Sequence, residues 1–159
     1  MLKNFTRLLI ILIFATTTAF AELVIDVQGV SQPTPVAIVP FGFEVSLPGV
    51  PLDIGAVIKG DLMRSVRFAP TAESDMLQKP TDGADVDFDD WSGLGVEAVV
   101  VGKLIQQRGS DAYTLQFQLF DIFRRKQLIG FRMPATRATV RAAAHRAADM
   151  IYEELTGIK

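Results

Sequence analysis

The sequence predicts an α/β domain in which a mixed sheet of about five strands carries two helices packed on one face. Three observations support this prediction. A nearly unbroken apolar run spans 96–105, an alternating apolar pattern spans 113–119, and helical periodicity appears at 53–66 and again from Thr136 to Gly157. The unbroken run is typical of a strand covered on both faces, and the alternation is typical of a half-buried strand. Two helices can cover a sheet that contains both kinds of strand.

The first 21 residues have the layout of a secretory signal peptide. Basic residues precede a short apolar run, and the small residues Ala19 and Ala21 form a cleavage pattern before Glu22. The apolar run is shorter than the roughly 20 residues that a membrane-spanning helix needs. We therefore expect cleavage after Ala21, a periplasmic mature chain of residues 22–159, and no membrane insertion after cleavage.

The mature chain would contain 138 residues, which is 159 minus 21, and this length suits one domain with its own core. Lys3 and Arg7 are lost with the signal, so 14 basic residues face 18 acidic ones and the net charge is −4. This weakly acidic balance indicates no nucleic-acid partner. The chain has no cysteine, so its core must be sufficient without disulfides.

The first elements of the mature chain are two strands and a helix. The alternating segment 22–28 predicts a strand with one apolar face, and the short apolar run 36–39 predicts a strand covered on both faces. A loop rich in proline and glycine then extends through Pro51. Asp53 can accept hydrogen bonds from the free amides of a helix start, so we predict a helix over 53–66.

A long surface loop and an antiparallel meander follow. Residues 69–90 contain two prolines and six aspartates without a sustained period, which predicts the loop. The apolar run 96–105 predicts the central strand of the sheet. The alternating run 113–119 and the segment 128–133 predict two further strands, joined to the first by turns.

Pro134 is expected to end the sheet, and Thr136 is expected to cap a final helix of about twenty residues that ends at Gly157. A spacing of four residues places three polar side chains on one face of this helix, namely Arg141, His145 and Asp149. We interpret them as a solvated, salt-bridged stripe. His145 is the only histidine, and no G-x-S-x-G motif accompanies it, so we assign no catalytic residue and predict that the chain is not an enzyme.

The segment Asp85 to Asp90 is the best candidate for a metal site, because its alternating carboxylates resemble the opening of a calcium loop. The sixth position of such a loop requires glycine and is Asp90 here, and the twelfth requires glutamate and is Val96. We therefore expect a solvated acidic loop without a metal or a cofactor. An Asp87→Ala change is expected to be nearly silent.

Three motifs together resemble the N-terminal domain of the TolB family. They are Asp53-Ile-Gly before a helix, Trp91-Ser-Gly-Leu-Gly-Val with Glu97-Ala-Val-Val-Val-Gly102, and the closing Tyr152-Glu-Glu-Leu-Thr-Gly-Ile-Lys159. The resemblance covers 22–159 and implies an α/β domain with two helices on a mixed sheet. A β-propeller follows this domain in the family, but no repeat of blade length fits after Lys159, so we expect no propeller and a fragment or truncated gene product.

The resemblance also implies a function in a Tol-Pal system, which supports outer-membrane integrity and invagination during cell division. In the family, the lipoprotein Pal binds the propeller, so Pal is not an expected partner here. The first mature segment of the family contacts the inner-membrane protein TolA. The matching residues in this chain are Glu22, Leu23, Val24, Ile25, Asp26 and Val27. Their alternation suits addition to a partner's sheet, but it equally suits a first strand of the domain's own sheet.

Two other functions remain open at the level of sequence. The first is a free-standing periplasmic α/β domain that acts as a regulator or assembly factor and docks a protein through its sheet edge. The second is a small periplasmic hydrolase that uses the carboxylates of the acidic loop. Removal of residues 22–32 separates a docking segment from a core strand, since only loss of a core strand unfolds the domain.

Overall fold

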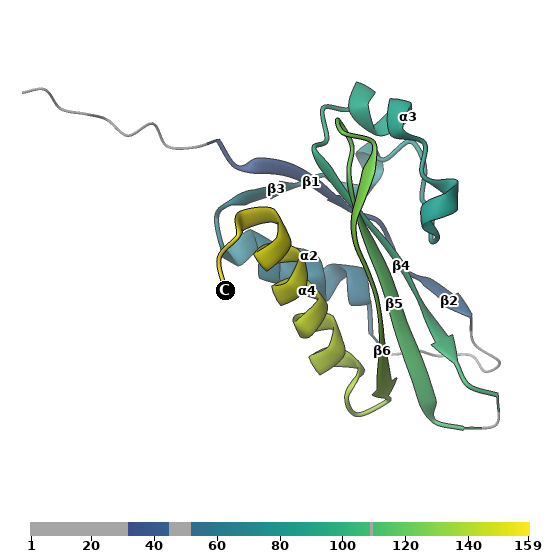
Figure 1. Ribbon diagram of the computed structural model, residues 1–159. Helices are drawn as coiled ribbons and strands as arrows, with labels where there is room; N and C mark the ends of the chain where they lie inside the picture. Colours follow the sequence, from purple (N-terminus) through teal and green to yellow (C-terminus); the bar gives the residue numbers. More distant parts are fainter. Residues whose placement is uncertain (1–31, 45–51, 109) are drawn as a thin grey trace, which may run out of the picture. The chain divides into compact units, whose positions relative to one another are not determined.

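The computed structural model describes residues 32–44, 52–108 and 110–159. These residues form a six-stranded mixed sheet with the order β3-β1-β4-β5-β6, and β2 pairs with the second half of β4 (Figure 1). The strands are β1 (Thr34–Ile38), β2 (Gly42–Glu44), β3 (Phe68–Pro70), β4 (Ala98–Gln106), β5 (Ala112–Asp121) and β6 (Lys126–Thr136). The helices are α2 (Ile54–Arg64), α3 (Phe88–Gly93) and α4 (Val140–Thr156), and two 3-10 turns span Glu73–Asp75 and Gly83–Asp85.

The structure confirms the antiparallel meander that the sequence predicts. β5 pairs with β4 on one side and with β6 on the other along nearly its whole length. A bulge between Leu119 and Phe120 shifts the register against β6. β1 and β2 run parallel to β4, so the sheet is mixed, as expected.

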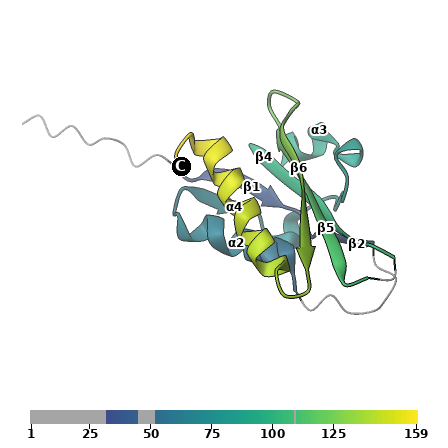
Figure 2. The same cartoon turned by 60° about the horizontal axis from the view of Figure 1, so that its bottom comes forward.

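Helices α2 and α4 contact each other and cover the same face of the sheet, which confirms the predicted arrangement (Figure 2). Asp53 begins α2, and its carboxylate accepts a hydrogen bond from the amide of Ala56 at 2.8 Å. Gly157 ends α4 with a φ of 69°, a left-handed conformation that glycine adopts without a steric penalty. Both helix boundaries therefore follow from local chemistry.

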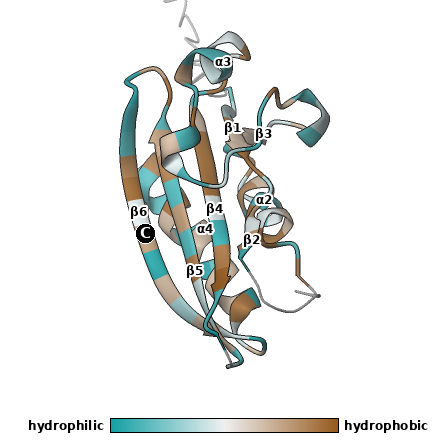
Figure 3. Cartoon of the chain, turned by 90° about the vertical axis from the view of Figure 1, so that its right-hand side faces the viewer, coloured by the Kyte–Doolittle hydropathy of each residue, from teal (hydrophilic) through white to brown (hydrophobic). Residues whose placement is uncertain are grey.

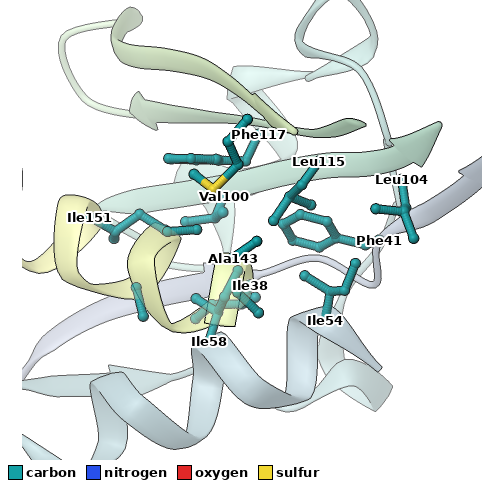
Figure 4. Close-up of a cluster of buried hydrophobic side chains, with 14 of the residues drawn as sticks. Ile38, Phe41, Ile54, Ile58, Val100, Leu104, Leu115, Phe117, Ala143 and Ile151 are labelled. Atoms are coloured by element: carbon teal, nitrogen blue, oxygen red, sulfur yellow. The ribbon is translucent and has the colours of Figure 1, made fainter. Parts of the chain in front are cut away.

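The sheet separates two hydrophobic clusters. The larger one fills the space between the sheet and the two covering helices, and it includes Ile58 and Ile151 (Figure 4). The smaller one lies on the opposite face, where Trp91 of α3 packs with side chains of β1, β4 and β5. Strand alternation sends Val100 into the first cluster and Val99 into the second, and both are fully buried.

Several boundaries differ from the sequence prediction. β6 continues through Pro134 to Thr136, because an outer strand can turn the missing amide hydrogen of a proline away from its paired neighbour. Thr139 precedes α4 in place of Thr136, and the Thr139 hydroxyl accepts a hydrogen bond from the Thr136 amide at 2.8 Å. β2 and most of β3 occupy segments that were predicted as loop, and each pairs in parallel with a longer strand.

We expect Leu119→Asp to prevent folding, because Leu119 is fully buried in the larger cluster. An unpaired carboxylate there costs several kcal/mol, a large part of the stability of a typical domain. Val100→Asp on β4 should act in the same way. Far-UV circular dichroism and thermal unfolding measure the effect. Leu77→Asp, at a position that is 67% exposed, is the matched control and should unfold like the parent chain. A cooperative transition at the parent midpoint for Leu119→Asp would contradict its placement in the core.

Candidate functional site

The segment predicted to dock a partner, Glu22 to Val27, lies outside the described residues, as does the predicted cleavage site at Ala19 and Ala21. The environment of β1, which begins at Thr34, still bears on the docking prediction. β1 is an interior strand that pairs with β3 along one edge and with β4 along the other. β3 pairs with Thr34–Val36 and β4 pairs with Val36–Ile38, so each edge of β1 already has a neighbouring strand.

An ionic cluster on the face opposite α2 and α4 joins the sheet to the segment after β3. In this Lys103 cluster, the Nζ atom of Lys103 lies 2.9 Å from Oε1 of Glu44 and 3.4 Å from Oδ2 of Asp82. Next to it, the amide of Gly83 donates a hydrogen bond to Oε1 of Gln118 at 2.8 Å. β2, β4 and β5 thus hold residues 82 and 83 against the sheet through polar contacts.

Pairing shifts the pKa values of two members of the Lys103 cluster. The hydrogen bond with Glu44 raises the pKa of Lys103 above its usual value of 10.5, although partial burial opposes this. The hydrogen bond from the Ala84 amide lowers the pKa of Asp82 below its usual value of 3.8, with partial burial opposing and Lys103 assisting. Both shifts favour the charged forms, so Lys103 and Asp82 are charged at neutral pH.

Gln116 lies beside this cluster on β5, in register with Lys103 of β4 and Arg132 of β6. Its side chain is almost fully buried, and its carboxamide oxygen has no hydrogen-bond partner among the described residues. It lines a recess of about 250 Å³ together with Gln118 and Arg132. Within this recess, Arg132 is exposed and can pair with an anionic group.

The acidic segment uses its carboxylates to build and hold α3, so the predicted surface loop over 69–90 is wrong from Phe88 onward, where the helix begins. Oδ1 of Asp87 accepts hydrogen bonds from the amides of Asp89 at 2.9 Å and Asp90 at 3.4 Å, which makes Asp87 the cap of α3. Asp89 forms a salt bridge with Arg125. Within the described ranges, no group of three His, Cys, Asp or Glu side chains could hold a metal ion.

His145 pairs with α2, which corrects the predicted stripe with Arg141 and Asp149. Its Nδ1 atom lies 2.6 Å from Oδ2 of Asp61, and Asp61 also forms a salt bridge with Arg64. The Asp61 side chain is only 16% exposed, so the pair joins two helices at the edge of their interface. Spacing within α4 cannot indicate a partner on another helix, which explains the error.

A groove of about 450 Å³ surrounds the Asp61–His145 pair. A hydrolytic triad would require a nucleophile within hydrogen-bond reach of the histidine. Among the described residues that line the groove, none is serine, threonine or cysteine. The arrangement resembles an inter-helix hydrogen bond more closely than an acid–base site. Its charged lining residues are Asp53, Asp61, Arg64, Arg141 and His145.

A second groove, of about 530 Å³, adjoins Thr34 at the start of β1. Glu97 and Glu154 supply carboxylates to its lining, Arg124 is paired with Asp121 there, and Phe123 and Leu128 supply apolar surface. Phe123 is 62% exposed. Acidic and apolar groups together suit a lysine or arginine side chain, whose stem packs on apolar surface while its head group meets a carboxylate.

Comparison with known proteins identifies relatives of this chain. The sequence matches the family described as the TolB amino-terminal domain over residues 22–128. It is 43% identical over 153 residues to the Tol-Pal system protein TolB of Thioalkalivibrio sulfidiphilus, which covers 94% of this chain and 35% of that protein. The protein of the same name from Nitrosococcus oceani is 44% identical over 152 residues, covering 95% of this chain and 34% of that protein. The chain thus spans about a third of the length of these curated relatives.

A solved structure shows the same fold. The crystal structure of TolB from Acinetobacter baumannii superposes with a TM-score of 0.66 at 28% identity, covering 80% of this chain and 29% of that chain. The mixed sheet and the absence of a closed barrel in the described residues agree with this likeness. No helix in the part of the chain described is long and apolar enough to cross a membrane.

We expect Lys103→Met to lower the free energy of unfolding at neutral pH by about 1 kcal/mol or less, because its carboxylate partners are more than a third exposed. The loss should shrink in acid. The folded pKa of Asp82 is depressed, so its contribution is present above 3.8 and disappears as the pH falls through the folded value. The folded pKa of Lys103 is raised, so its contribution is lost only as the pH rises above 10.5.

Urea unfolding at neutral pH and at a pH below the folded pKa of Asp82 measures this difference. Lys126→Met is the matched control, because Lys126 is exposed and forms no salt bridge within the described residues. An equal loss for Lys103→Met at both pH values would contradict the assigned pairing.

Asp87→Ala should cost about 1 kcal/mol of stability, because it removes the side-chain cap of α3. This replaces the silent effect expected from sequence. The urea midpoint should fall without a change in the dependence of stability on urea, equally in calcium and in chelator. Asp85→Ala, in the neighbouring 3-10 turn, is the control and should change little. A loss confined to calcium-containing buffer would indicate a metal site.

Proposed function

The chain belongs to the family of TolB amino-terminal domains, and on this premise we propose that it is a periplasmic interaction module of a Tol-Pal-type system. It docks a TolA-like inner-membrane protein through residues Glu22 to Val27. Through this contact it supports outer-membrane integrity and invagination during cell division. A Pal-type lipoprotein is not among the partners that we propose for these residues.

The interior position of β1 supports the interpretation of residues 22–28 as a docking segment over a strand of the domain's own sheet. Residues 22–28 precede β1 by only a few residues, and both edges of β1 are already paired. On the β1 side of the sheet the outer strand is β3, which is only three residues long. The segment is therefore better suited to add to a partner's sheet, where backbone hydrogen bonds supply affinity and Leu23 and Ile25 enter pockets.

Processing and docking fit together in this proposal. Cleavage between Ala21 and Glu22 removes the signal, residues 1–21, and makes the docking segment the first part of the mature chain. Separately, the groove beside Thr34 at the start of β1 has carboxylates and apolar side chains in its lining, and these suit a basic residue of a partner.

We propose no catalytic activity for the domain. The chemistry that supports this choice is the pairing of His145 with Asp61 in a groove whose described lining supplies no nucleophile. Near α3, Asp87 caps the helix, Asp89 pairs with Arg125, and Asp90 accepts a hydrogen bond from the Gln78 side chain. Each of these groups has a structural partner that accounts for its position.

Removal of residues 22–32 should abolish binding to the C-terminal domain of the TolA-like protein while changing circular dichroism and melting little. Calorimetry measures the binding, and the intact mass of the exported chain establishes that it starts at Glu22. Two aspartate substitutions on opposite faces of the segment refine the test. Ile25→Asp should abolish binding because it places a charge in an apolar pocket, whereas Val24→Asp should retain most of it.

Unchanged binding after the deletion would contradict the docking proposal. A collapsed fold after the deletion would show instead that residues 22–32 belong to the core. Equal effects of the two aspartate substitutions would argue against a strand with one apolar face.

A further inference from the structure

β6 is the outer strand of the sheet, and within the described residues no strand pairs with its outer edge. It is 11 residues long and contains no acidic residue. Figure 3 shows β6 along the outer side of the sheet, with hydrophobic residues in part of its length. An open edge of this length presents a row of backbone donors and acceptors that another strand can pair with.

Pro134 indicates which residues of β6 turn their backbone groups outward. A proline in an outer strand occupies a position whose missing N–H would face away from the sheet. The direction of the backbone groups alternates along a strand, so Gly130 and Arg132 share the orientation of Pro134. Gly130 has no side chain, and the Gln127 side chain lies where a Cβ of residue 130 would be.

The two sides of β6 differ in chemistry. On the side of α4, Ile129 is half-buried and Phe131 is 41% exposed, with its ring 6.4 Å from that of Phe117. On the other side, Arg132 is exposed and borders a recess of about 250 Å³. An added strand would therefore meet apolar side chains on one face and the cation Arg132 on the other.

We propose that the outer edge of β6 binds a strand of a protein partner that is apolar on the side of α4 and acidic on the opposite side. Charge complementarity supports this occupant. Lys126 and Arg132 are exposed, and neither forms a salt bridge with another described residue. A carboxylate of the added strand pairs with Arg132, and apolar side chains of its other face cover Ile129 and Phe131.

The basic residues of β6 have a second possible role, because charged side chains on outer strands also prevent unwanted pairing. The two roles give opposite results when the charge is removed. Arg132→Ala weakens binding of an acidic strand if Arg132 recognises it. The same change promotes association of the protein with itself if Arg132 only repels other strands.

Two synthetic peptides test the proposal, one of alternating valine and glutamate and the other of alternating valine and lysine. Each is titrated into the exported protein, and backbone amide resonances of β6 are followed by NMR. The glutamate peptide should shift the resonances of Gly130 and Arg132, and the lysine peptide should not. Arg132→Glu should lower the affinity for the glutamate peptide by about fivefold or more. Arg137→Glu, an equal charge change in the turn after β6, should have no effect.

Four results would overturn the proposal. Equal binding of both peptides, or binding that Arg132→Glu does not weaken, would exclude recognition of acidic strands. Dimerisation of Arg132→Ala in light scattering would identify Arg132 as a residue that prevents pairing. Binding that appears only after removal of residues 22–32 would assign the edge to the chain's own first segment. These results do not depend on TolA-like binding, so this proposal and the proposed function can fail separately.

Discussion

Burial of β4 is the constraint on which the other layers of the domain depend. From Ala98 to Val101 its side chains are at most 2% exposed, and they point alternately to the two faces of the sheet. A strand that is apolar on both faces requires a cover on each side. Helices α2 and α4 form one cover, and the segment that carries α3 forms the other, with Trp91 as its largest buried side chain. Pairing with β1, β2 and β5 satisfies both backbone edges of β4.

Regular burial explains which parts of the fold could be predicted from the sequence. The apolar run of β4, the alternation in β5 and the cap at Asp53 are local patterns, so the strands of the meander and helix α2 were predictable. β2 and β3 have three residues each, which is too short for a pattern, and they exist because longer strands pair with them. The position of Pro134 inside β6 depends on β6 being an outer strand, which is a property of topology.

The contacts of the candidate site were less predictable, because they join residues far apart in the chain. Lys103 and Glu44 are 59 residues apart, and His145 and Asp61 are 84 apart. Helical spacing indicates only partners three or four residues away, so it assigned His145 to the wrong neighbours. The cap at Asp87 was different, because an aspartate directly before a helix is a local signal. The high density of aspartates around it favoured the interpretation as a solvated loop.

The strand pairing and the covering layers that stabilise the sheet also limit how the domain can bind an extended chain. β1, β4 and β5 are paired on both sides, and β3 offers only three residues. One face lies under two helices, and the other is covered by the α3 segment and the Lys103 cluster. Two routes remain for strand pairing: a segment of this chain outside the described sheet adds to a partner, or a partner adds to β6. The first route leaves every hydrogen bond of the sheet in place, whereas the second extends the sheet by one strand. β4 and β5 separate β6 from β1 in the strand order, so a strand bound at β6 leaves the pairing of β1 unchanged.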